Sequence, residues 1–230
     1  MFWRRELIME KYTAVIPVRE SREGQLNDKD ILPFGNGNLL THKIEQLKKL
    51  KDVKILVTTE SDRLKRMAME QEIEVLMRPN ELSQTETAFG ELVKYVAKNV
   101  KTERMMWCCV TSPLFDENNF AEAITLYEQA KADGFDSLIS VKKLQRYILD
   151  KNGALNYRIG KHMKNISQLP LLYIFTNGVS IAARNDMEKW GYTQGNLPYL
   201  YEIEKPNAID ICDEYDYQCA RFFYKQRTRK

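Results

Sequence analysis

The 230-residue chain is 43% hydrophobic and 29% charged, which is enough apolar material for the core of one sizeable domain. Its 35 Lys and Arg residues nearly balance 32 Asp and Glu residues. The sequence contains no basic block that would predict a nucleic-acid surface. There is no apolar stretch of about 18 residues that would predict a membrane span, and the four cysteines and two histidines lack zinc-site spacing.

The N-terminus lacks the apolar segment of a secretory signal, and free thiols suit a reducing compartment. We therefore expect a cytoplasmic protein. Residues 1–10 are expected to form an N-terminal extension, followed by a single domain over residues 11–230.

Short apolar runs alternate with amphipathic stretches along the first part of the chain. The pattern predicts strands at 12–18, 53–59, 73–78 and 105–113, and helices at 39–50, 61–71, 86–99 and 117–132. Four successive strand-then-helix units favour an α/β fold of Rossmann type, with a mainly parallel sheet and helices on both faces.

The regular alternation weakens after the apolar segment 136–143. Residues 144–172 contain few regular runs and are interpreted as a protruding arm. Later strands are predicted at 177–184 and 199–204, and a closing helix at 213–226 with Asp213 near its N-cap.

Four polar segments follow predicted strands: the loop after Pro17, "TTE" at 58–60, "TSP" at 111–113 and "IDIC" at 209–212. Ligands of open parallel sheets bind beyond the carboxyl ends of the strands, so these segments are expected to share one crevice.

The loop that follows the first strand has the composition of a phosphate site, with fixed cations and a flexible turn. Its candidate residues are Arg19, Ser21, Arg22, Gly24 and Lys29. An ordinary charged surface loop would have a similar composition, and the loop matches neither common glycine-rich phosphate motif.

The order of several short motifs resembles the acylneuraminate cytidylyltransferase (CMP-sialic acid synthetase-like) family. After the first loop come "RPNEL" at 78–82, "ETA" at 86–88, "TSPL" at 111–114, "SQLP" at 167–170, "NG" at 177–178 and "AIDICDEYDY" at 208–217. Each motif is weak by itself, whereas their collinearity from residue 13 to about 223 is specific.

The resemblance implies a nucleotide-diphospho-sugar transferase fold, CTP and an acidic sugar as substrates, and Mg²⁺ as cofactor. Arg19 and Lys29 would hold the triphosphate, and Asp30 would lie near the base. The nucleotide end of the crevice would be lined by Arg78, Glu86, Thr87 and Ser112. Gln168 and Asn177 would face the acceptor, and Asp210, with Asp213 beside it, would bind the metal.

Some of these residues also have ordinary structural explanations. Ser112 can cap a turn before Pro113, and Asn177-Gly178 is a common turn dipeptide. Gln168 can be a merely exposed residue of the arm.

The sequence departs from the family pattern at several positions. Glu23 replaces a lysine of the first turn, and Phe115 replaces a common arginine. The segment "KNIS" at 164–167 lacks the arginine that the family usually has there for an acidic acceptor, with Lys161 or Lys164 as substitutes. Cys212 stands where a second metal-binding carboxylate is expected, and a thiol is a poor ligand for Mg²⁺. We therefore predict a weakened metal site.

Three functional hypotheses remain at this stage. The first is an active CMP transferase for a nonulosonic acid or a related acidic sugar. The second is a diverged homologue that binds nucleotide or a partner protein without turnover, and the third is a related transferase with a non-sugar acceptor. In resembling proteins the arm packs across a two-fold partner, so a homodimer is expected.

Overall fold

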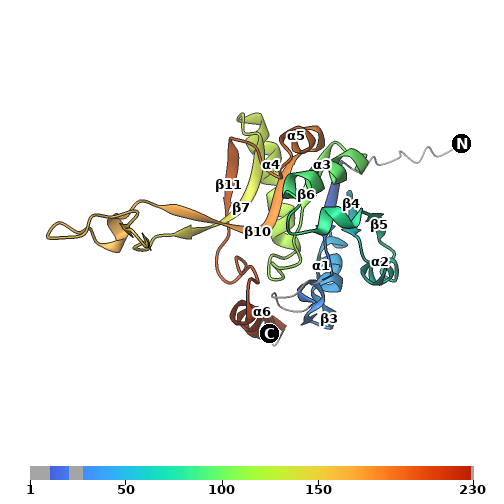
Figure 1. The fold of residues 1–230 in the computed structure, drawn as a ribbon, viewed down its shortest axis with the longest axis horizontal. Helices are drawn as coiled ribbons and strands as arrows, with labels where there is room; N and C mark the ends of the chain where they lie inside the picture. The colour runs from blue at the N-terminus through green and yellow to red at the C-terminus, as the bar shows by residue number, and fades with distance from the viewer. Residues whose placement is uncertain (1–10, 21–27, 229–230) are drawn as a thin grey trace, which may run out of the picture.

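A seven-stranded sheet lies at the centre of the computed structural model, which describes residues 11–20 and 28–228 (Figure 1). Its strands lie in the order β11, β7, β10, β6, β1, β4, β5. Their bounds are β1 Tyr12–Pro17, β4 Val53–Thr59, β5 Glu74–Met77, β6 Arg104–Trp107, β7 Ser137–Leu144, β10 Leu172–Ala183 and β11 Pro198–Glu202. Within this sheet β10 runs antiparallel to β6 and β7, and the other pairs are parallel. The predicted mainly parallel sheet is confirmed.

Helices cover both faces of the sheet. They are α1 Leu39–Leu47, α2 Asp62–Met69, α3 Phe89–Asn99, α4 Glu117–Ala132, α5 Arg184–Trp190 and α6 Glu214–Thr228. No helix of the described ranges is long and apolar enough to cross a membrane.

Alternation along the central strands divides the apolar residues between two cores. Ala14 and Ile16 of β1 pack with α1, α2 and α4, whereas Val15 packs on the opposite face with α3 and α5. Successive strand residues point to opposite faces, which explains why near-continuous apolar runs form the buried strands.

The predicted arm at 144–172 extends away from the rest of the molecule (Figure 1). Strands β7 and β10 pair from Leu172↔Leu144 at the base of the arm into the sheet. The arm contains the short pair β8 Leu149–Asp150 and β9 Gly153–Ala154, and the 3-10 turn η3 Ile166–Gln168. Another short pair, β2 Pro33–Phe34 and β3 Gly37–Asn38, precedes α1.

Some predicted boundaries were wrong. The strand predicted at 105–113 ends at Trp107, because the chain leaves the ladder soon after Cys108 donates its N–H to Val15 O at 2.9 Å. The helix predicted from residue 86 begins at Phe89, because Glu86 and Thr87 belong to the turn before it.

His42 lies between aromatic rings on the packed side of α1. Its ring centroid is 4.9 Å from that of Phe34 and 5.3 Å from that of Tyr224, and its Nε2 lies 3.1 Å from Pro113 O. Burial and the nearby Lys43 charge lower the pKa of His42 to about 4. The imidazole is therefore neutral in the folded protein at neutral pH.

This environment predicts acid sensitivity. Between pH 6.5 and 4 the unfolded chain binds a proton at His42 that the folded chain does not bind, so the free energy of unfolding falls as the pH falls. We expect His42→Gln to remove up to about 3 kcal/mol of this dependence, measured by urea unfolding at pH 7 and pH 4. His162→Gln, at an exposed position of the arm, is the matched control. Equal pH dependence in the two variants would contradict the prediction.

Candidate functional site

A pocket of about 360 Å³ lies at the carboxyl ends of β1, β4 and β5. Its polar lining includes Arg19, Asp30, Arg78 and Thr87, and Phe89 and Leu92 contribute apolar surface. Residues that are separated by up to about 70 positions in the chain thus meet at the edge where ligands of parallel sheets bind. The pocket is within the volume range of small-molecule sites.

Arg78 is a buried support of this pocket. Its guanidinium donates to Thr58 O at 2.9 Å, to Val18 O at 2.8 Å and to Ser83 Oγ at 2.8 Å. It also pairs with Glu60 at 2.9 Å. Because these contacts occupy four of its five N–H donors, Arg78 fixes the ends of β1 and β4 and the turn η2 (Asn80–Ser83), and so shapes the wall of the pocket.

Arg19 and Asp30 connect the end of β1 with the 3-10 turn η1 (Lys29–Ile31). The Arg19 N–H donates to Asp30 Oδ2 at 2.9 Å, and its Nη1 donates to Ser83 O at 3.2 Å. The pKa of Asp30 is raised above its usual value, because burial outweighs the Arg19 N–H and the charges of Lys29 and Arg19, which lower it. The pocket thus contains both a cation and an acceptor that a nucleotide can contact.

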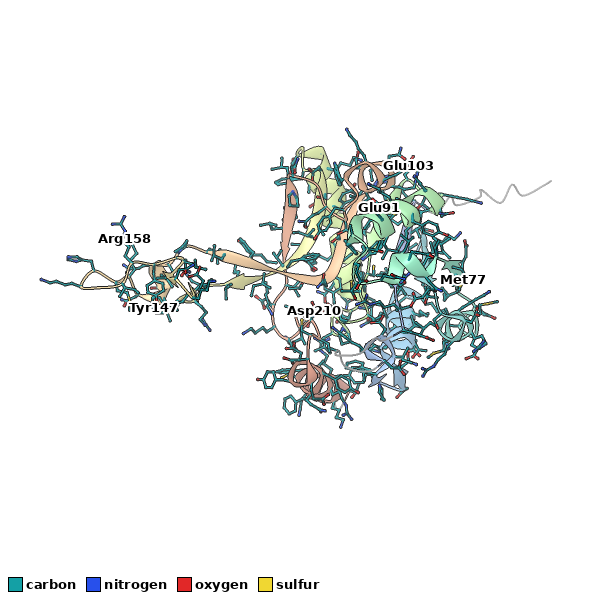
Figure 2. All side chains as sticks on the ribbon, in the orientation of Figure 1. Met77, Glu91, Glu103, Tyr147, Arg158 and Asp210 are labelled. Atoms are coloured by element: carbon teal, nitrogen blue, oxygen red, sulfur yellow. The ribbon has the colours of Figure 1, made fainter. Side chains whose placement is uncertain are left out.

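Asn177 of β10 and Asp210, which Figure 2 labels in the body of the molecule, form a second polar group. Asn177 Nδ2 donates to Asp210 Oδ2 at 2.7 Å. Asn177 adopts a positive φ of 52°, a conformation that asparagine tolerates better than most residues. It lies in an irregular part of β10, where five steps from Phe175 to Ser180 face two steps on β7.

Cys109 lies just beyond β6, close to charged residues of both polar groups. Burial and the charges of Asp210 and Asp30 raise the pKa of its thiol to about 12, whereas the charges of Lys43 and Lys29 oppose this rise. The thiol is therefore neutral at neutral pH.

The turn between β6 and α4 supports this region. Ser112 is buried, and its hydroxyl donates to Thr176 O at 2.7 Å, whereas Thr111 O accepts from Ile211 N at 2.8 Å. Ser112 thus anchors the backbone beside Asn177. Phe115 is also buried, packs on Phe120 with centroids 4.7 Å apart, and belongs to the core.

Among the residues that the structure describes, Asp210 is the carboxylate of this polar group that is available to a metal. No group of three or more His, Cys, Asp or Glu residues within 11–20 and 28–228 is arranged to hold a metal ion. Asp213 Oδ1 accepts from Asp216 N at 2.9 Å and so caps α6. Burial and Asp210 raise the pKa of Cys212, which keeps its thiol protonated. The donor set fits Mg²⁺ only if phosphate oxygens and water complete its shell.

The remaining predicted residues lie elsewhere. Glu86 is exposed on the turn before α3, and Gln168 is exposed on the arm, where its Oε1 accepts from Asn165 N at 3.2 Å. Ser21, Arg22 and Gly24, with the neighbouring Glu23, lie outside the described residues. Sequence reasoning missed Ser83 and Lys43, because a single hydroxyl or basic residue carries no motif. It placed Glu60 in the crevice as part of "TTE" at 58–60, but not as the ion-pair partner of Arg78.

The chain matches known proteins over nearly its whole length. Residues 13–227 match the protein family described as "Cytidylyltransferase". An N-acylneuraminate cytidylyltransferase of Escherichia coli O18:K1:H7 is 24% identical over 96% of this chain and 54% of its own length. One of Streptococcus agalactiae serotype III is 26% identical over 96% of this chain and 55% of its own length. The chain thus spans about half the length of these curated relatives.

Solved structures share the fold at low sequence identity. CMP:2-keto-3-deoxy-manno-octonic acid synthetase complexed with CTP has a TM-score of 0.68 and 11% identity, over 94% of this chain and 99% of the other. The 4-diphosphocytidyl-2C-methyl-D-erythritol synthase of Anaerococcus prevotii DSM 20548 has a TM-score of 0.65 and 12% identity, over 95% of this chain and 98% of the other. With the match over residues 13–227, the motifs and the parallel sheet, this chain belongs to the cytidylyltransferase family.

Proposed function

We propose that the protein transfers CMP from CTP to an acidic sugar, a nonulosonic acid or a similar compound. The main support is convergence: the motif residues Arg19, Asp30, Arg78 and Thr87 line one pocket, and Asn177 and Asp210 lie beside the same sheet edge. Family membership and the names of the curated relatives support the same chemistry.

In the proposed reaction an acceptor hydroxyl oxygen attacks the α-phosphorus of CTP. An oxygen–phosphorus bond forms, the bond from the α-phosphorus to the bridging oxygen breaks, pyrophosphate leaves with that electron pair, and the hydroxyl proton passes to solvent. Such chemistry depends on in-line positioning and on neutralised phosphate charge.

We assign roles to the predicted residues on this basis. Arg19 and Lys29 bind phosphate oxygens, Asp30 contacts the cytidine part, and Arg78 holds the pocket wall. Ser112 keeps the segment beside Asn177 in place. Asp210, oriented by Asn177, would hold Mg²⁺, which supplies phosphate charge neutralisation when bound.

The arm supports an acidic acceptor and a homodimer. Residues 144–172 contain five Lys or Arg residues and one Asp. A hollow of about 710 Å³ on the arm is lined in part by Arg158, His162 and Lys164, close in sequence to Gln168. Figure 2 shows Arg158 far out on the arm, so we propose that the arm reaches the site of a second subunit. Four free cysteines support the reducing cytoplasm as the location.

One observation favours a second candidate, a homologue that binds nucleotide without turnover. Within residues 11–20 and 28–228, Asp210 has no second carboxylate beside it that is free to bind a metal, because Asp213 caps α6 and Asp216 accepts from Cys212 N. Nucleotide binding with no pyrophosphate release, over a panel of acidic sugars, would support this candidate. Release with a non-sugar acceptor alone would point to a related transferase.

Calorimetric titration with CTP is the first test of the proposal. We expect selective CTP binding over ATP, GTP and UTP, strengthened by Mg²⁺. Arg19→Ala should weaken CTP binding at least about tenfold, since a hydrogen bond to a charged group is worth about 1.5–3 kcal/mol. Arg66→Ala on α2, at an exposed position, is the matched control. Absence of CTP binding in the wild type would refute the proposal.

The substitution Cys212→Asp tests the metal assignment. A second carboxylate beside Asp210 should lower the Mg²⁺ concentration at half-maximal pyrophosphate release several-fold. Cys212→Ser, which adds no charge, is the control and should leave that concentration unchanged. If both variants behave like the wild type, Mg²⁺ does not bind between residues 210 and 212.

The homodimer is tested by sedimentation at micromolar concentration. Leu155 and Ile159 on the arm are 62% and 72% exposed, so their burial against a second subunit would be favourable. We expect a dimer for the wild type and a monomer for Leu155→Asp. Leu197→Asp, at an apolar position of the body that is 57% exposed, should remain dimeric. A monomeric wild type would exclude the arm-mediated dimer.

A further inference from the structure

Lys43 is a fully buried lysine on α1, and the described residues provide no carboxylate within ion-pair distance of it. Its Nζ donates to Ser112 O at 2.9 Å and to Phe115 O at 3.1 Å, and lies 4.9 Å from the centroid of the Phe120 ring. Burial lowers its pKa to about 8, so the ammonium form still predominates at neutral pH. A buried charge is costly, and here backbone carbonyls and an aromatic face compensate for the lost water.

Both carbonyls belong to the turn that joins β6 to α4. This turn holds the candidate site from two sides: the Ser112 hydroxyl bonds to Thr176 O, and Thr111 O accepts from Ile211 N. Thr176 precedes Asn177, and Ile211 follows Asp210, so each hydrogen bond fixes the neighbour of a residue in the Asn177–Asp210 pair.

We propose that Lys43 is a positioning residue, whose two hydrogen bonds to the 111–115 turn hold Asn177 and Asp210 in register with each other. Lys43 does not touch the ligand; it acts through Ser112 and the backbone of residues 111 and 115. The effect on ligand binding rests on the proposed function, whereas the effect on the position of the two segments does not.

An apolar side chain could fill the space but could not serve this role. Removal of the ammonium would leave the carbonyls of Ser112 and Phe115 without their side-chain donor in a buried site. Phe115 O would lose its donor, and Ser112 O would keep only the longer bond from Phe115 N at 3.3 Å. Unpaired buried acceptors are unfavourable, so the turn would shift to find other donors. Such a shift would loosen the bonds at Thr176 and Ile211.

Hydrogen exchange measured by mass spectrometry tests the proposal with Lys43→Met. Exchange of the amides over 208–212 and 174–180 should rise about tenfold, whereas exchange in β1 and β4 should change less than twofold. Lys48→Met makes the same substitution at an exposed position of the same helix region and should leave both segments unchanged. Unchanged exchange in Lys43→Met would overturn the proposal.

A calorimetric measurement on the same variants separates this inference from the proposed function. The ratio of CTP affinity with Mg²⁺ to CTP affinity without it should be at least threefold lower in Lys43→Met than in the wild type. The affinity for CTP without Mg²⁺ should stay within twofold of the wild type. If exchange over 208–212 and 174–180 rises while Mg²⁺ strengthens CTP binding as in the wild type, Lys43 is a positioning residue. In that case Asp210 does not bind the metal.

A second variant covers the case in which Lys43→Met does not fold. Lys43→Gln retains N–H donors on a shorter side chain and should give exchange between wild type and the values expected for Lys43→Met. Lys48→Gln is its control. Wild-type exchange over 208–212 in Lys43→Gln, or a rise that is equally large in β1 and β4, would contradict a local positioning role.

Discussion

The carbonyl groups of the turn between β6 and α4 impose the constraint on which the rest of the site depends. This turn is buried, so its acceptors need partners inside the protein. α1 provides them from one face: His42 and Gln46 bond to Pro113 O, and Lys43 bonds to Ser112 O and Phe115 O. The helix therefore does more than cover the sheet, because it fixes a loop that lies across the ends of several strands.

Two supports with different chemistry position the two halves of the site. The pocket lined by Arg19 and Asp30 is held by the ion pair of Arg78 and Glu60, with Ser83 bonded to both. The Asn177–Asp210 half is held by an ammonium and by backbone bonds. In both halves a buried cation with hydrogen bonds to backbone carbonyls fixes the geometry.

The sequence predicted the sheet and its order of strand and helix units because apolar periodicity is a local property. The bounds of β4 and α4 match the predicted ranges, and Asp213 caps α6 as expected. The short helix α5 was not predicted, since its seven residues carry too few turns for a clear period. Asp210 and Asn177 were singled out separately, but their contact joins β10 to the segment between β11 and α6, 33 residues apart in sequence.

The supporting residues were beyond sequence reasoning for a different reason. Lys43 and Glu60 look like solvent-exposed charges in a one-dimensional pattern, and their burial depends on which loops fold over them. Phe115 illustrates the reverse case. It is a departure from the family motif, yet it packs in the core against Phe120 and Gly178, where an added Cβ would lie 2.6 Å from its ring. Its replacement therefore alters packing rather than the lining of the pocket.

The path of β10 has a mechanical consequence. One continuous strand runs from the arm into the sheet, and its irregular stretch, with Asn177 at positive φ, lies between the two parts. At about 3.3 Å per residue, Asn177 is about 17 Å along the strand from Leu172 at the base of the arm. A rotation of the arm would act on β10 where its pairing with β7 is interrupted, at the residue that bonds to Asp210. A contact that turns the arm would therefore also turn the side chain that orients this carboxylate.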